Sequence, residues 1–264
     1  MDRNVHLAPP GPAHGHWLAL LTLLGALALA AHGPIAQWPT YHQFADARAW
    51  GLLPNAANVL SNLPFAAIGA WGWCRLKHHP RMRAWRVFAA AVGLTALGSS
   101  VYHWHPANAS LMADRLPIAW ACASLLCAFL AERVDKRWAD AKTLGLALLT
   151  GSLAVVWWGI GESQGHGDLR AYVFVQFLPM LLIPVALALK MKPISANALP
   201  ASAWWSALAF YAAAKGMELA DHALLEETLG VVSGHSLKHL LAAGTAAWLL
   251  RAAVLSCLSY GSRR

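Results

Sequence analysis

The chain has 264 residues, of which 58% are hydrophobic and 12% are charged, about half the charged share of an ordinary soluble domain. This composition predicts an integral membrane protein that folds as one bundle and has the lipid bilayer as its surroundings. The net charge of +8 does not indicate a nucleic-acid-binding protein, because the basic residues lie in short clusters between apolar segments.

Eight apolar segments follow one another, each long enough to cross about 30 Å of hydrocarbon as a helix. The first is interpreted as a spanning helix, because its end offers no clear signal-peptide cleavage site. The predicted fold is an all-α membrane bundle of seven helices with one extra helix at the N-terminus. The segments are 17–32, 57–75, 86–104, 115–132, 143–161, 171–189, 202–223 and 236–256.

These segments divide the chain into five parts. A leader (1–15) precedes the extra transmembrane helix (16–33), and an outer loop (34–56) leads into the seven-helix domain (57–258), which a short tail (259–264) follows.

The distribution of Lys and Arg predicts the orientation in the membrane. If the segments alternate in direction, 15 of the 20 basic residues fall on the side that holds both termini. Excess positive charge marks the cytoplasmic face. Both termini are therefore expected in the cytoplasm, and a bacterial inner membrane is the preferred location, although a eukaryotic internal membrane fits the same pattern.

Ionisable residues gather at the opposite, non-cytoplasmic ends of the segments. Such groups are costly inside a membrane and are a reason to expect function. Independent segments place them at one level, which random scatter would not be expected to produce. They are His103, Asp114, Glu218, Asp221, His235 and His239.

The spacing of three histidines favours a metal site. His235 and His239 are four residues apart, so a helix places them on one face, where both imidazoles can bind one ion. His103 would be the third ligand, and three imidazoles with one open position are typical of catalytic zinc. Asp114 could then act as a base toward a zinc-bound water, and Ser99 could donate a hydrogen bond to an oxyanion. The set predicts a hydrolytic site.

Each residue also has a simpler interpretation. A membrane histidine often only joins two helices by a hydrogen bond, and Ser99 could be a helix-packing serine. Asp114 could be an acidic residue at the start of a helix. Glu218 and Asp221 could simply pair with Lys215 or Lys238.

Four short motifs, taken together, resemble the alkaline ceramidase family. That family lies within a membrane-hydrolase superfamily that also includes adiponectin-receptor-like proteins. Each motif alone is weak, but their order and spacing match the family pattern over residues 58–239. The motifs are Asn58-Val59-Leu60-Ser61-Asn62, Ser99-x-x-x-His103, Asp114 followed by Leu116-Pro117, and His235-x-x-x-His239.

The resemblance implies a seven-helix bundle with an intramembrane zinc ion and hydrolysis of ceramide-type lipids to a sphingoid base and a fatty acid. It implies His103, His235 and His239 as zinc ligands, with Asp114 and Ser99 acting on the water and the oxyanion. A calcium site is not expected. The acidic cluster that binds calcium in animal members is replaced here by Asp46 alone, and Asn55 stands where a glutamate would be expected.

Three other functions stay open at this point. A receptor or sensor of the same superfamily would use zinc only structurally, with a fourth protein ligand. A proton-coupled transporter could relay protons through Glu218 and Asp221, although no matched broken helices are evident. A b-type haem protein would need histidines facing each other across the bundle, which a pair on one helix does not suit.

Overall fold

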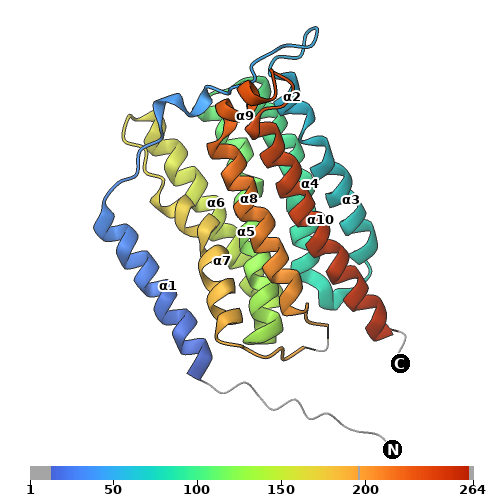
Figure 1. Ribbon diagram of the computed structural model, residues 1–264. Helices are drawn as coiled ribbons and strands as arrows, with labels where there is room; N and C mark the ends of the chain where they lie inside the picture. Colours follow the sequence, from blue (N-terminus) through green and yellow to red (C-terminus); the bar gives the residue numbers. More distant parts are fainter. Residues whose placement is uncertain (1–12, 196, 262–264) are drawn as a thin grey trace, which may run out of the picture.

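The computed structural model describes residues 13–195 and 197–261, and their regular structure is entirely helical (Figure 1). Most of the predicted leader and half of the predicted tail lie outside the described residues. The long helices are α1 (Ala13–His32), α3 (Leu63–Leu76), α4 (Arg83–Trp104), α5 (Asn108–Arg133), α6 (Ala141–Ser163), α7 (Arg170–Ala188), α8 (Ala201–Leu219) and α10 (Gly234–Gly261). The short ones are α2 (Ala56–Leu60), α9 (Asp221–Glu227) and the 3-10 turns η1 (Pro39–His42), η2 (Pro80–Met82) and η3 (Lys136–Ala139).

Six of the helices are long and apolar enough to cross a membrane, namely α1, α4 with η2, α5, α6, α7 and α10. This confirms the prediction of an all-α, multi-pass membrane protein. The shorter α3, of 14 residues, packs on α4, and α8 packs along α10, so both belong to the bundle without meeting that criterion. The count of seven spanning helices after α1 stays a prediction.

Two predicted segments are interrupted. The expected helix over 57–75 is broken between α2 and α3 at Ser61 and Asn62, where both side chains bond to the Asn58 carbonyl oxygen. Side chains of Ser and Asn that bond to nearby backbone compete with a continuous helix in this way. The expected segment 202–223 ends at Leu219, and Asp221 begins the separate helix α9.

The expected start of the 115–132 segment is also wrong. Helix α5 begins at Asn108, because the Ser110 hydroxyl accepts a hydrogen bond from the Ala107 backbone N–H at 3.1 Å and satisfies the helix start there. Asp114 therefore lies within α5 and does not open it.

The helices pack around α5, which contacts α4, α6 and α7, while α10 lies between α8 and α3 (Figure 1). Helix α1 packs at the periphery against α7, and most of its apolar side chains stay exposed, as expected of a surface that meets lipid. The start of α1 and the end of α10 lie at one end of the bundle. The α4–α5 connection, α9 and the start of α10 lie at the other end, so the segments that carry the predicted functional residues meet at one level.

The closest approach of α4 and α5 occurs at Gly98. A Cβ atom on Gly98 would lie 2.0 Å from the Ala113 carbonyl oxygen, so only glycine fits there. Ser99 and Asp114 follow these two residues in the chain, and the close approach therefore brings their side chains to the same part of the bundle.

We predict that Gly98→Ala destabilises the protein by about 1–3 kcal/mol or more, because the helices must separate to admit the methyl group. The thermal unfolding midpoint of the purified protein measures this. Gly145→Ala in α6 is the matched control, since a Cβ there has no neighbour within 4 Å. It should be neutral or stabilising, by up to about 1 kcal/mol from helix propensity. Equal stability of the two variants would contradict the close approach.

Candidate metal centre

Three histidines from two helices meet at the end of the bundle opposite the start of α1. His103 lies in the last turn of α4, and His235 and His239 lie in the first two turns of α10. All three are buried, and their ligand nitrogens lie within 4.8 Å of one another. The predicted trio is therefore confirmed as a group of side chains that could hold a metal ion.

The spacing of the nitrogens suits a tetrahedral zinc. His103 Nε2 and His235 Nε2 are 3.3 Å apart. Two nitrogens bound at 2.0–2.1 Å to one tetrahedral ion would be separated by about 3.3–3.4 Å. The two imidazoles thus already lie at the separation that a shared ion requires, and neutral imidazole is a ligand that zinc favours. The donor set fits zinc without excluding other divalent metals.

Ser61 fixes the tautomer of His239. The Ser61 hydroxyl donates to the Asn58 carbonyl oxygen at 2.9 Å, so its oxygen must accept the proton of His239 Nδ1 at 2.7 Å. This leaves Nε2 of His239 without a proton and available as a ligand. Hydrogen bonds of this kind orient metal-binding histidines and strengthen them as ligands.

Asn55 holds the backbone at His103. Its side-chain amide donates to the His103 carbonyl oxygen at 2.8 Å, at the point where α4 ends. Asn55 has a positive φ of 46°, a left-handed conformation that asparagine tolerates better than most residues. A glutamate, expected here from the family resemblance, would supply no such donor.

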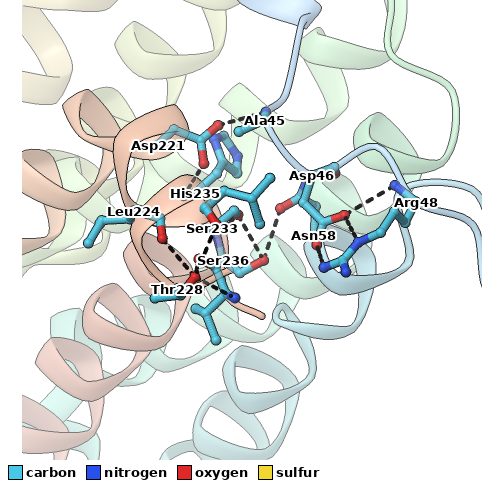
Figure 2. A network of polar contacts seen from close by, with 12 residues as sticks. Ala45, Asp46, Arg48, Asn58, Asp221, Leu224, Thr228, Ser233, His235 and Ser236 are labelled. Carbon is cyan, nitrogen blue, oxygen red and sulfur yellow. Dashed lines mark hydrogen bonds and ion pairs between the residues drawn. The ribbon is translucent and has the colours of Figure 1, made fainter. Parts of the chain in front are cut away.

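Asp221 fixes the start of α10 (Figure 2). Its two carboxylate oxygens accept hydrogen bonds from the backbone N–H groups of His235, at 2.7 Å, and Ala45, at 3.0 Å. The second bond holds the outer loop so that the ring of Phe44 lies 4.6 Å from the ring of His103 and 4.9 Å from that of His235. Phe44 therefore covers the histidines on the loop side.

A second set of hydrogen bonds ties the same loop to α2 and α10 (Figure 2). The Asn58 amide donates to the Asp46 carbonyl oxygen and its side-chain oxygen accepts from the Ser236 hydroxyl, both at 3.0 Å. Asn58 thus bridges α2 and α10. Asp46 and Arg48 form an ion pair, and the hydrogen bond from the Arg48 guanidinium holds the pKa of the buried Asp46 carboxyl below its usual range.

Asp114 and Ser99 lie together beside the histidines. Both are buried, at 9% and 2% exposed, and both line the cavity that His235 and His239 also line. The Asp114 Oδ1 atom has no hydrogen-bond partner. Ser99 lies close enough to Asp114 to interact electrostatically with its carboxyl. Its predicted role as an oxyanion donor stays a prediction.

The cavity has a volume of about 780 Å³. Along α10 its lining runs from His235 to Leu249, a distance of about 21 Å at 1.5 Å per residue. Its deeper part is formed by apolar side chains of α4, α5, α7, α8 and α10. These include Phe88, Leu125, Ile183, Trp204 and Leu249. The space suits a long, unbranched apolar chain that ends at the histidines.

Two lysines neutralise Glu218. Lys238 Nζ donates to one carboxylate oxygen at 2.9 Å, and Lys215 pairs with the other. Lys238 Nζ also lies 3.2 Å from His235 Nε2, the atom that a metal would take. Glu218 is thus ion-paired with lysines, which was the simpler alternative to a role in proton relay. Asp221 pairs with backbone N–H groups instead of a lysine.

Comparison with protein-family models and with curated proteins finds no match to this chain. The site is therefore assigned on its own geometry. The sequence alone had assigned no part in the site to Ser61 or Phe44, and had assigned to Lys238 only a pairing with Glu218. Only the Ser61 motif carried a signal, because it belongs to the N-x-x-S-N pattern.

We predict that Ser61→Ala weakens metal binding by about 10- to 100-fold, because His239 loses the acceptor that fixes its tautomer. Competition with a chelator of known affinity measures this on the purified protein. Ser100→Ala is the control, since the Ser100 hydroxyl contacts only the Val59 carbonyl oxygen, at 3.4 Å. A Ser61→Ala protein with undiminished affinity would show that His239 does not bind through Nε2.

Proposed function

We propose that this protein is a zinc-dependent hydrolase that cleaves lipid amides within the membrane. The observation that carries the proposal is that three imidazoles converge, and that two of them line a long apolar cavity together with a buried carboxyl that has a free oxygen. Active sites place a Lewis acid and a general base within reach of one reacting group, and the cavity supplies the place for an acyl chain.

His103, His235 and His239 would hold the metal. A zinc ion there would polarise the amide carbonyl and lower the pKa of water toward about 7. Asp114 takes a proton from the attacking water, whose oxygen bonds to the acyl carbon. The C–N bond then breaks, and Asp114 returns the proton to the leaving nitrogen, so that water is divided between a fatty acid and an amine.

Ceramide-type lipids are the first substrates to test, because the motif pattern resembles alkaline ceramidases. The products would be a sphingoid base and a fatty acid. In a receptor with a structural zinc, the buried Asp114 carboxyl would have no role as a base. The transporter alternative is less favoured, because Glu218 is bonded by two lysines and Asp221 by two backbone N–H groups.

The first test is the metal content of the detergent-purified protein. We expect about one zinc per chain in the wild type and a large loss in His235→Ala, which removes one of three ligands. His105→Ala is the matched control. It removes an exposed histidine only two residues from His103 and should keep the metal. Absence of metal from the wild type would contradict the proposal.

The second test separates hydrolysis from a structural metal. We predict that Asp114→Asn lowers the rate of ceramide hydrolysis by about 10²- to 10⁴-fold, the range typical of a lost general base. Its metal content should not change, because Asp114 is not a ligand. Mass spectrometry of the released sphingoid base measures the rate, and Asp135→Asn at the opposite end of the bundle is the control. Zinc-loaded protein that hydrolyses no lipid amide would instead favour the receptor.

A further inference from the structure

Arg115 is a buried cation for which the proposed reaction has no use. It follows Asp114 on α5, is 5% exposed, and lines the same cavity. Its guanidinium carbon lies 4.0 Å from the centre of the Trp158 ring, with the rings of Tyr172 and Tyr41 at 5.0 and 5.6 Å. Three aromatic rings therefore surround the guanidinium and hold it in place.

The hydrogen bonds of Arg115 are incomplete. Nη2 donates to the Gln37 side-chain oxygen at 2.5 Å, whereas Nη1 is buried and has no hydrogen-bond partner. No carboxylate among the described residues forms an ion pair with it. A buried charged donor left unpaired is costly, and a site that keeps one is suited to a ligand that completes its bonds.

We propose that Arg115 binds the carboxylate of an acyl lipid held in the cavity. The inference rests on the proposed function, which places the acyl chain there. The two oxygens of a carboxylate match the planar pair of N–H donors of a guanidinium. The three rings that enclose the guanidinium carry no charge, so a ligand with one negative charge matches the one positive charge of Arg115.

The position of Arg115 places this carboxylate in the same cavity as the reacting group. Arg115 and Asp114 are consecutive on α5, and both side chains line that cavity. The scissile amide and the bound carboxylate therefore share one cavity. Two sources provide such a carboxylate: the head group of an N-acyl amino acid, or the fatty acid that hydrolysis releases.

The test measures binding instead of turnover. The full-length protein in lipid nanodiscs is titrated by calorimetry with N-octanoylglycine, octanoate and the neutral N-octanoylethanolamine. We expect Arg115→Gln to lower the affinity for the carboxylate ligands by about 10- to 100-fold, as for loss of a charge-assisted hydrogen bond. The affinity for the ethanolamide should not change. Loss for N-octanoylglycine alone assigns the substrate head group, and equal loss for octanoate assigns the released fatty acid.

A second variant keeps Arg115 and its packing. Gln37→Glu places a carboxylate of the protein itself beside the guanidinium, so it should lower the affinity for the same carboxylate ligands. This variant tests the site even if Arg115→Gln fails to fold. Gln176→Glu is the matched control, because it adds the same charge to the cavity wall one helical turn beyond Tyr172 on α7. Its effect should be much smaller.

The outcomes separate this inference from the proposed function. Carboxylate ligands that bind equally well to Arg115→Gln and the wild type would overturn the carboxylate site. So would equal losses in Gln37→Glu and Gln176→Glu, which would mean that only the overall potential of the cavity matters. Turnover of N-octanoylglycine is followed on the same samples. Binding that depends on Arg115, without cleavage, would contradict the proposed hydrolase activity but would support the carboxylate site.

Discussion

The Asp221 carboxylate is the interaction on which the arrangement of the site depends. It joins the backbone of Ala45 to that of His235, two segments that lie far apart in the sequence, and each of its oxygens takes one N–H. The helix that carries two of the three imidazoles and the loop that covers them are thereby held at one point. In a protein interior a bond of this kind is stronger than in water, and its loss would leave buried groups unpaired.

Close helix contacts set the second constraint. The contact of Gly98 with the Ala113 carbonyl joins α4 to α5, and so relates the helix of His103 to the helix of Asp114. Gly234 has the same role at α10, because a Cβ there would lie 2.1 Å from the Met217 carbonyl oxygen of α8. Four helices that meet through glycines can hold their polar groups at fixed separations, which sites of this kind require.

Much of the fold could be predicted from the sequence, because hydropathy reports each apolar segment locally. The pairing of His235 with His239 was equally local, since four residues on a helix determine a common face. His103 could be added only by counting segment directions. The start of α5 was missed because the charged pair Asp114 and Arg115 interrupts the apolar run, and the cap made by the Ser110 hydroxyl does not show in a hydropathy profile.

The rest of the site depends on distances between separate segments, which no local pattern records. Ser61 bonds to His239 across 178 positions, and Arg115 reaches Gln37 across 78. The break at Ser61 and Asn62 was missed because their neighbours are apolar enough for an unbroken helix. Its cause is competition by two side chains for the Asn58 carbonyl.

The N-terminal helix acquires a role from its attachment. Helix α1 touches the bundle mainly along α7, and the segment that follows it covers the cavity through Gln37, Trp38 and Tyr41. That segment is fixed where the Ile35 backbone bonds to Asp168 and Leu169. Helix α1 thus anchors, through its contact with α7, the segment that covers the cavity. The cover of the cavity and the histidine group are therefore held by different parts of the chain.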